Sequence, residues 1–585
     1  MSDNRFFLFD TYRKIKHKLP SYVLKSIIKL IPIYLITSIF EIFGLFILFP
    51  VIKVIIDPSI IHTNKYVNYI YSTLHFTSNT SFVLFLFSSV TLLFVLKNLL
   101  IYLISKRQIA IAFSLANRLS LEKYNSYLKK SYGFHSDNNT AVLLRNFTQM
   151  PFELINYIIL PFIAILNELL VLLLIITGIT IYDPLLFWSL IIFTAPFLLI
   201  YNKIYKKKLR EVSLKRDEES ANMYKLGLQS MEAFREITLF NKTGYFKPLF
   251  KNTVDKYSKS LSETYLMNAF SPKFVETVAV LAIFSIFISG FLLNKDLAVL
   301  AQFLILFAIA AFRLIPSMNK IILSSNYIKS SSYIFKHFDA SIEEVTPEAE
   351  MPLSPPISFR EKLVIKDLSF SFSEKNVQVL DKLNLVITKG QTIGIIGSSG
   401  TGKTTLLNIL LRLHSESSGG IYVDDTKVDR SNVSSWYRLV SYVPQNITLL
   451  DGTITENIAF GVPVNEVDEA LLKKVINQSQ LEEFVKTLPL GCETQIGEKG
   501  MRISGGQRQR IGIARALYHG GQILIFDEAT SSLDTETEEM LTEAINNISH
   551  KDLTIIIVAH RMQTLKYCDT IYKLNKGLIS LSHQN

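Results

Sequence analysis

Six apolar stretches fill most of the first 340 residues, and each is near or above the ~20 residues with which a helix crosses a bilayer. They cover roughly residues 23–56, 82–105, 151–181, 184–205, 274–293 and 297–315. Very short segments, around Asp183-Pro184 and around Asn294-Lys295-Asp296, join two pairs of them. Others continue as polar helical patterns, over residues 106–130 and 206–240. We therefore expect residues 1–340 to form a membrane domain of six helices with long extensions on one side.

The distribution of lysine and arginine predicts which side that is. Lysine and arginine are frequent in residues 1–29 and in the two long excursions between apolar stretches, which begin with the polar patterns at 106–130 and 206–240. Residues 57–80, in contrast, contain only one lysine or arginine, Lys65. Because basic residues favour the cytoplasmic side, we expect both excursions and both termini to be cytoplasmic. On the opposite side, residues 64–76 space apolar side chains as a helix would. That pattern indicates a short amphipathic helix or, equally well, a loop with aromatic anchors.

The composition agrees with a membrane protein. Charged residues make up 19% of the 585 residues, and the mean hydropathy is +0.28. A net charge of +11 would suit nucleic acid, but the basic residues flank apolar segments, so we expect anionic lipid and no nucleic acid as a partner. Cys492 and Cys568 are too few for a disulfide framework and favour a reduced location. The N-terminal residues lack a cleavable signal pattern.

Four cations lie in or beside the apolar stretches, where a charge costs about 2.5–3.5 kcal/mol at a helix centre. They are Lys97, Lys273, Arg313 and Lys320. Counting ~1.5 Å per residue along each helix places them at a similar depth, in the cytoplasmic half. They could bind an anionic headgroup, or each could extend to the interface or pair locally, as Lys273 could with Glu276. For Glu41 and Glu168, also in apolar stretches, we favour hydrogen bonding between helices.

A glycine-rich segment in the second half matches the pattern G-x-x-x-x-G-K-[ST]. It follows an apolar run typical of a strand, at residues 392–396, and precedes one typical of a helix, at residues 406–411. Its backbone N–H groups would surround phosphate oxygens, Lys403 would reach the β- and γ-phosphates, and the Thr404 hydroxyl would bind Mg²⁺. We therefore expect this chain to bind ATP or GTP. The segment comprises Gly397, Ser398, Ser399, Gly400, Thr401, Gly402, Lys403, Thr404 and Thr405.

The acidic, proline-rich residues 341–358 indicate a linker, and residues 359–585 have the composition of a soluble α/β domain. Strand-like runs occur at 392–396, 421–423, 439–443, 523–526 and 554–558. One of them delivers Asp527 to its end, where a carboxylate could bind Mg²⁺, and Glu528 beside it could activate the attacking water. Another ends at His560, which could contact the γ-phosphate.

A second phosphate-binding helix terminus is predicted at Ser504, Gly505, Gly506 and Gln507, which open the helical segment RQRIGIARAL. The glycine-rich segment already accounts for one nucleotide. We therefore expect this second terminus to bind a nucleotide that another copy of the chain holds.

Together, ISGGQRQR, the glycine-rich segment and ILIFDEATSSLD resemble the ATP-binding cassette of an ABC transporter, and six spans before one cassette resemble an exporter-class half-transporter with the type IV fold. The resemblance implies an α-helical membrane domain of six transmembrane helices plus an α/β P-loop cassette, acting as an ATPase with ATP and Mg²⁺. Its catalytic residues would be Glu528, His560 and Gln445, with Gln445 also on Mg²⁺. Asp534 would line a dimer interface, and residues 494–500 would contact the membrane domain.

Two departures from the family pattern stand out. Ile503 replaces the usual leucine before the Ser504 signature, which is minor. Phe372 occupies the position of the adenine-stacking tyrosine. A phenyl ring still stacks on adenine but lacks the hydroxyl, so ATP affinity could differ.

Within the exporters, residues 313–320 (RLIPSMNK) and the run around Glu41 resemble lipid-linked oligosaccharide flippases. That resemblance implies a homodimer in the bacterial inner membrane that moves a lipid-linked anionic amphiphile outward, although a heterodimer is not excluded. A lipid A-like or multidrug exporter shares every cassette motif. A peptide exporter with processing activity would need a peptidase domain, for which residues 1–22 are too short. A nucleotide-gated channel or regulator would be expected to have a degraded Glu528 or signature.

Overall fold

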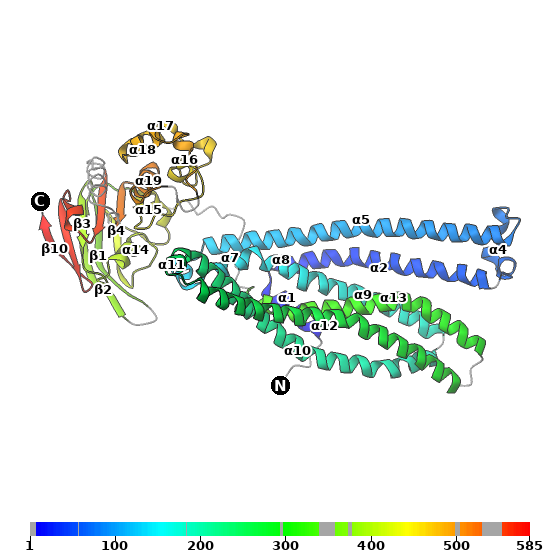
Figure 1. The fold of residues 1–585 in the computed structure, drawn as a ribbon. Helices are drawn as coiled ribbons and strands as arrows, with labels where there is room; N and C mark the ends of the chain where they lie inside the picture. Colours follow the sequence, from blue (N-terminus) through cyan, green and yellow to red (C-terminus); the bar gives the residue numbers. More distant parts are fainter. Residues whose placement is uncertain are drawn as a thin grey trace. The chain divides into compact units, whose positions relative to one another are not determined.

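The computed structural model describes residues 7–56, 58–182, 184–292, 297–338, 357–372, 377–497, 503–528 and 553–584. Asp534, residues 498–500 and most of the expected linker lie outside these ranges. The chain divides into two compact units (Figure 1). The first comprises Met1–Lys130 and Asp137–Val345, and the second comprises Thr346–Asn585 together with the short segment Ser131–Ser136.

Long helices build the first unit. They are α1 (Phe7–Lys18), α2 (Ser21–Ile56), α5 (Asn79–Leu128), α9 (Leu160–Tyr182), α10 (Pro184–Glu232), α12 (Thr243–Leu292) and α13 (Leu297–Ser330). Helix α2 packs beside α5, α9 beside α13, and α10 beside α12 (Figure 1). The polar extension expected over residues 106–130 is continuous with its apolar stretch as far as the end of α5, whereas the one expected over 206–240 is continuous only to the end of α10 at Glu232. Helix α12 also joins polar and apolar sequence without a break.

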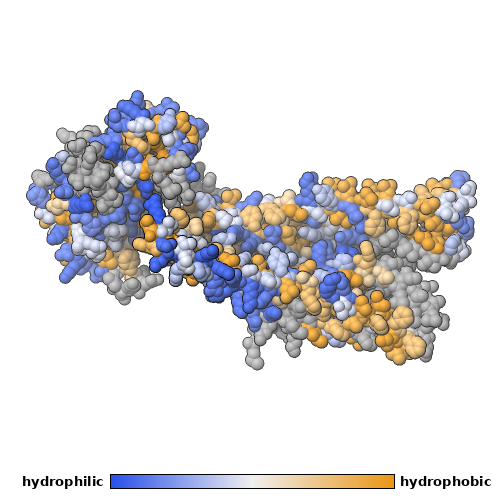
Figure 2. Space-filling view, viewed as in Figure 1, coloured by the Kyte–Doolittle hydropathy of each residue, from blue (hydrophilic) through white to orange (hydrophobic). Residues whose placement is uncertain are grey.

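Four helical segments within the described residues are long and apolar enough to cross a membrane: Ser21–Glu41, Asn79–Leu128, Met150–Gly178 and Thr243–Leu292. Figure 2 shows hydrophobic side chains along the outer surface of the long helices. Leu92, Val95 and Leu99 on α5, for example, are all exposed. Lipid is the surrounding that suits such a surface. The other two expected spans fall on α10 and α13, so a count of six remains a prediction.

Short helices connect the long ones. They are α3 (Ile60–Thr63), α4 (Lys65–Thr73), α6 (Tyr132–Asp137), α7 (Thr140–Thr148), α8 (Met150–Leu154), the π-helix η1 (Ile155–Ile159), α11 (Phe234–Leu239) and the 3₁₀-helix η2 (Ser332–Lys336). Of the two readings of residues 64–76, the helix is confirmed as α4. The Asn64 side chain starts it by accepting hydrogen bonds from the backbone N–H groups of Tyr66 and Val67, at 3.0 and 3.3 Å.

Two sheets organise the second unit. The antiparallel sheet has the order β2-β1-β4-β5, from β1 (Lys362–Phe372), β2 (Val377–Thr388), β4 (Ser418–Val423) and β5 (Thr426–Lys427). The larger sheet has the order β10-β9-β3-β8-β7-β6, from β3 (Thr392–Ile396), β6 (Val440–Val443), β7 (Ile523–Asp527), β8 (Thr554–Ala559), β9 (Thr570–Asn575) and β10 (Leu578–Gln584). Strands β9, β3, β8, β7 and β6 are parallel neighbours, so their carboxyl ends lie at one edge.

All five strands expected from apolar runs are present, at β3, β4, β6, β7 and β8. The antiparallel pair β1–β2 and the β9–β10 hairpin were not expected. Buried residues alternate with others along β1, and β10 has no buried residue, so a search for continuous apolar runs overlooks these strands.

Helices cover the sheets in two groups. The core between the sheets includes α14 (Lys403–Leu410) and α15 (Val433–Leu439). A second core lies under α16 (Ile454–Ile458), α17 (Glu469–Gln478), α18 (Glu482–Lys486) and α19 (Gly505–Tyr518). Three short 3₁₀-helices, η3 (Val464–Glu466), η4 (Gly491–Glu493) and η6 (Met562–Leu565), complete the described elements.

Trp436 anchors the core between the sheets. Its side chain is fully buried, and its indole N–H donates to the backbone carbonyl of Leu410 at 2.9 Å. Replacing Trp436 by alanine should lower the stability of the second unit by about 3–5 kcal/mol, because it empties a large buried volume. Thermal unfolding of the full chain in detergent, followed by circular dichroism, measures this. Trp188→Ala, at an exposed position on α10, is the control; equal melting temperatures for the two variants would contradict the prediction.

Candidate functional site

The glycine-rich segment forms a tight loop between β3 and α14. Gly400 and Gly402 have φ values of +82° and +103°, which side chains rarely adopt. A Cβ at Gly397 would lie 2.6 Å from the backbone carbonyl oxygen of Leu574, so only glycine fits there. Lys403 opens α14, and its ammonium donates to the backbone carbonyls of Gly397 and Ser398 at 2.8 and 3.2 Å. The loop therefore has the preformed shape that a phosphate requires.

The two adjacent carboxylates at the end of β7 have different surroundings. Asp527 accepts a hydrogen bond from the Tyr442 hydroxyl at 3.2 Å, and burial raises the pKa of its carboxyl. One oxygen of Glu528 accepts from the Gln445 amide at 2.8 Å, and the other lies 2.7 Å from Nε2 of His560. The three expected catalytic side chains are thus in one hydrogen-bonded group.

Lys403 connects this group to the glycine-rich segment, called the phosphate loop below. Its ammonium lies 3.4 Å from Nε2 of His560, and burial lowers the pKa of this lysine, while the Glu528 and Asp527 charges oppose that change. The backbone of Glu528 has a φ of +46°, unusual for a residue with a side chain, and its N–H continues the ladder by donating to Val558 at 2.9 Å. At this turn the two side chains point to different partners: that of Asp527 to Tyr442, and that of Glu528 to Gln445 and His560.

The donor set around the loop fits Mg²⁺. The Thr404 hydroxyl is exposed in the first turn of α14, the Asp527 carboxylate lies at the end of β7, and the Gln445 amide follows β6. All three offer oxygen, the ligand that this hard cation prefers, together with phosphate oxygens of the nucleotide.

The second expected phosphate-binding terminus is the start of α19. The Ser504 hydroxyl accepts from the backbone N–H of Gln507 at 3.2 Å, and the Gln507 side chain accepts from the backbone N–H of Ser504 at 2.8 Å. Ser504 and Gly505 are exposed. Reciprocal capping of this kind fixes the helix start and leaves its first turn at the surface.

Phe372 belongs to a cluster of rings. Its ring, 44% exposed as a residue, meets Phe370 at 5.0 Å and His414 at 6.0 Å between centroids, edge to face in both cases. A fourth ring, that of Tyr132, also contacts His414, at 5.8 Å between centroids. Tyr132 lies in the segment Ser131–Ser136, which belongs to this unit. Sequence reasoning found Phe372 but missed Tyr132, His414 and Tyr442, because their partners lie far away in the chain.

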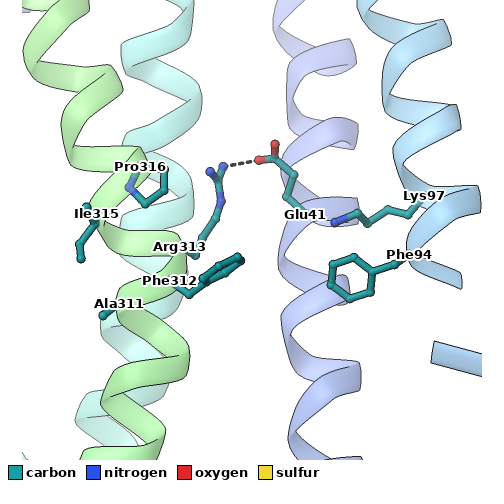
Figure 3. Close-up of a pocket in the computed structure, with 8 residues that line it drawn as sticks. All are labelled: Glu41, Phe94, Lys97, Ala311, Phe312, Arg313, Ile315 and Pro316. Carbon is teal, nitrogen blue, oxygen red and sulfur yellow. Dashed lines mark hydrogen bonds and ion pairs between the residues drawn. The ribbon is translucent and has the colours of Figure 1, made fainter. Parts of the chain in front are cut away.

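A pocket of about 460 Å³ opens among the membrane helices (Figure 3). Its lining comprises Glu41, Phe94, Lys97, Ala311, Phe312, Arg313, Ile315 and Pro316. Arg313 forms ion pairs with Glu41 on α2 and, at 3.1 Å, with Glu168 on α9. Lys97, on α5, extends toward Glu41 from the other side of α2 (Figure 3).

The four cations expected at one site are only partly brought together. Arg313 and Lys97 line the pocket. Lys320 is next to this group, since its ammonium pairs with Glu168 at 2.8 Å. Lys273 is exposed on α12, outside the pocket lining, and pairs with Glu276 at 3.1 Å, which is the local alternative considered from the sequence.

Comparisons with known proteins cover both units. Residues 27–314 match the family "ABC transporter transmembrane region", and residues 380–531 match the family "ABC transporter". An ATP-dependent lipid A-core flippase of Francisella novicida is 32% identical over 405 residues, 67% of this chain and 67% of that protein. The flippase of the same name from Francisella tularensis subsp. holarctica (strain OSU18) is 33% identical over 405 residues, 67% of this chain. The match spans 65% of that relative's length.

A solved structure shares the fold of the whole chain. It is described as a bacterial Atm1-family ABC exporter with ATP bound and has a TM-score of 0.73 at 19% identity. The similarity covers 97% of this chain and 96% of the other.

Replacing Glu528 by glutamine should leave ATP binding intact and lower hydrolysis by about 10²–10⁴-fold, the usual contribution of a general base. The reason is that Glu528 lies beside the phosphate loop without forming part of it. ATPase rates and nucleotide affinity of the full chain in lipid nanodiscs are the measurements. Glu483→Gln, at an exposed position on α18, is the matched control. Near-normal hydrolysis by the Glu528 variant would show that the base is another group.

Phe372→Ala should weaken ATP binding by about 1–3 kcal/mol, the range for a single stack of a base on an aromatic ring. Phe372→Tyr should be nearly neutral, because it keeps the ring. Equilibrium ATP binding in the Glu528→Gln background separates affinity from turnover. Phe460→Ala, at a position 43% exposed in the same unit, should not change the affinity. If Phe372→Ala also leaves it unchanged, a different side chain stacks on adenine.

Proposed function

This chain belongs to the ABC transporter family, in which an ATP-binding domain couples hydrolysis to transport, and on that premise we propose that it is an ATP-driven flippase. Its substrate is a lipid-linked anionic amphiphile, a polyprenyl-pyrophosphate oligosaccharide, which it moves from the inner to the outer leaflet of a bacterial inner membrane. The observation that carries this proposal is the pocket among the membrane helices, where Lys97 and Arg313 line one cavity. A cation in such surroundings is costly without an anionic partner, and among the described residues Lys97 forms no ion pair.

In ATP hydrolysis, each residue of the nucleotide site has a separate role. The loop N–H groups and Lys403 would bind the phosphates, while Thr404, Gln445 and Asp527 would hold Mg²⁺, which would supply positive charge against the phosphates. Glu528 accepts the proton of the attacking water. Both of its carboxylate oxygens are engaged in this structure, one by Gln445 and one by His560. Each oxygen keeps a second lone pair that can accept from the water, so Gln445 and His560 hold the carboxylate in place for it.

The exposed start of α19 supports a homodimer. In that arrangement, two nucleotides lie between two cassettes, and each contacts Lys403 of one copy and Ser504 of the other. Asp534 lines the same interface. The segments near residues 130–140 and 213–226 transmit closure to the membrane helices, with both termini on the cytoplasmic side. The ring contact between Tyr132 and His414 supports this role for the first segment, because it joins that segment to the ring cluster containing Phe372.

A second candidate substrate is a lipid A-like molecule. It is favoured by the Francisella relatives, which are lipid A-core flippases. Both candidates carry phosphate groups on a lipid, so a cationic pocket suits either. Competition between them in one transport assay decides which is preferred.

Arg313→Gln with Lys320→Gln should stop flipping of a fluorescent polyprenyl-pyrophosphate glycan in proteoliposomes and leave basal ATPase largely intact. The double variant leaves Glu41 and Glu168 without their ion-pair partners, and among the described residues Glu168 keeps only the Ser317 hydroxyl, which disturbs the packing of a buried charge. A charge-balanced variant that adds Glu41→Gln and Glu168→Gln therefore accompanies it. Flipping at the wild-type rate by the balanced variant would mean that the cations only neutralise the two carboxylates. Transport of lipid A but not of the glycan by the wild type would favour the second candidate.

A further inference from the structure

We propose that the pocket between α2, α5 and α13 is an anion-exchange site: a phosphate or pyrophosphate group binds Arg313 and Lys97 by displacing the Glu41 carboxylate. Glu41 is then an internal competitor of the substrate and sets its affinity. Binding of a phosphate-type anion follows from the pocket itself, whereas the lipid as its source rests on the function proposed above.

The two carboxylates that pair with Arg313 are held very differently. Glu168 is fully buried, and both of its oxygens are engaged, by Lys320 at 2.8 Å and by Ser317 at 2.7 Å as well as by Arg313. The Glu41 side chain is 28% exposed, and Arg313 is its hydrogen-bond partner among the described residues. Glu41 can therefore leave without abandoning other bonds, while Glu168 cannot.

Arg313 retains an unused donor. Both of its ion pairs are made by one terminal nitrogen, Nη2, and its buried Nε has no hydrogen-bond partner in the described part of the chain. A buried N–H without an acceptor is unfavourable. Nε and Nη2 form one edge of the guanidinium, and two oxygens of a phosphate can accept from both at once. A phosphate in place of Glu41 would thus satisfy the donor that Glu41 leaves unpaired.

Lys97, on α5, supplies a second positive charge to the pocket, in addition to that of Arg313 on α13. Its ammonium lies 4.3 Å from the centre of the Phe94 ring, and within the described residues it forms no ion pair. Lys320 and Lys273 do have carboxylate partners, at 2.8 and 3.1 Å. Figure 3 shows Glu41 between Arg313 and Lys97, so an anion in that position meets cations from two helices. The group of Lys97, Arg313 and Lys320 against Glu41 and Glu168 also has an excess of positive charge.

The pocket has room for the exchange. Its volume of about 460 Å³ lies within the range of small-ligand sites, about 300–1,000 Å³. Phe94, Phe312 and Ile315 form apolar walls beside the charged groups. Walls of this kind suit a headgroup whose lipid chain continues into the bilayer.

The test is equilibrium binding to the full chain in zwitterionic nanodiscs, with undecaprenyl pyrophosphate, undecaprenol and inorganic pyrophosphate as probes. We expect Glu41→Gln to bind undecaprenyl pyrophosphate about tenfold more tightly and Lys97→Gln about tenfold more weakly, since each removes one nearby charge. Undecaprenol should bind all variants alike. Glu276→Gln and Lys273→Gln, the same substitutions in an exposed pair outside the pocket, should leave affinity unchanged. Melting temperatures are recorded for every variant.

Each outcome decides the proposal. If Glu41→Gln leaves affinity unchanged or weakens it while remaining folded, Glu41 is not a competitor and the exchange is refuted. If Lys97→Gln binds as the wild type does, Lys97 takes no part. If the wild type binds neither anionic probe, the pocket is not an anion site. Should inorganic pyrophosphate follow the same variant pattern and the lipid not bind, the anion site stands and the flippase function fails. Should the wild type flip the lipid while these variants bind it equally, the function stands and this pocket is not its site.

Discussion

A charge removed from water must find a partner, and this requirement determines how the helices of the first unit meet. Glu168 is completely buried on α9, and an unpaired carboxylate there would cost several kcal/mol. It is compensated by Arg313, Ser317 and Lys320, all on α13. One buried acid thereby fixes the register of α13 against α9. The same arginine also pairs with Glu41, so α2 is joined to that pair through one partly exposed ion pair.

The second unit uses the same chemistry for a different purpose. Glu528 lies between Gln445 and His560, and His560 in turn meets Lys403. These side chains follow β6, β7, β3 and β8, strands that end at one edge of the sheet. The group therefore connects the glycine-rich loop, through Lys403 and His560, to Glu528. Each unit therefore has a partly exposed carboxylate beside two other polar side chains: Glu41 near Arg313 and Lys97, and Glu528 near Gln445 and His560.

Local features could be predicted from the sequence, and long-range pairs could not. The phosphate loop, the strand ending in Asp527 and Glu528, and the helix of residues 65–73 each depend on neighbours within a few residues. The contact of Tyr132 with His414 and the pair of Glu41 with Arg313 join residues far apart in the chain. Counting residues along a helix gives depth but not the direction in which a side chain points. That is why Lys97 and Arg313 share a pocket while Lys273 turns away toward Glu276.

The close approach of Gly397 to Leu574 has a consequence for how the protein is made. The carbonyl of Leu574 belongs to β9, which is synthesised long after the phosphate loop. On the ribosome, the loop, α14 and even α19 emerge before the strand against which Gly397 rests. A nascent chain therefore carries every residue proposed to bind phosphate before the glycine-rich loop has its supporting surface. Nucleotide can assist the folding of this unit only in its last stage, when β9 takes its place beside β3.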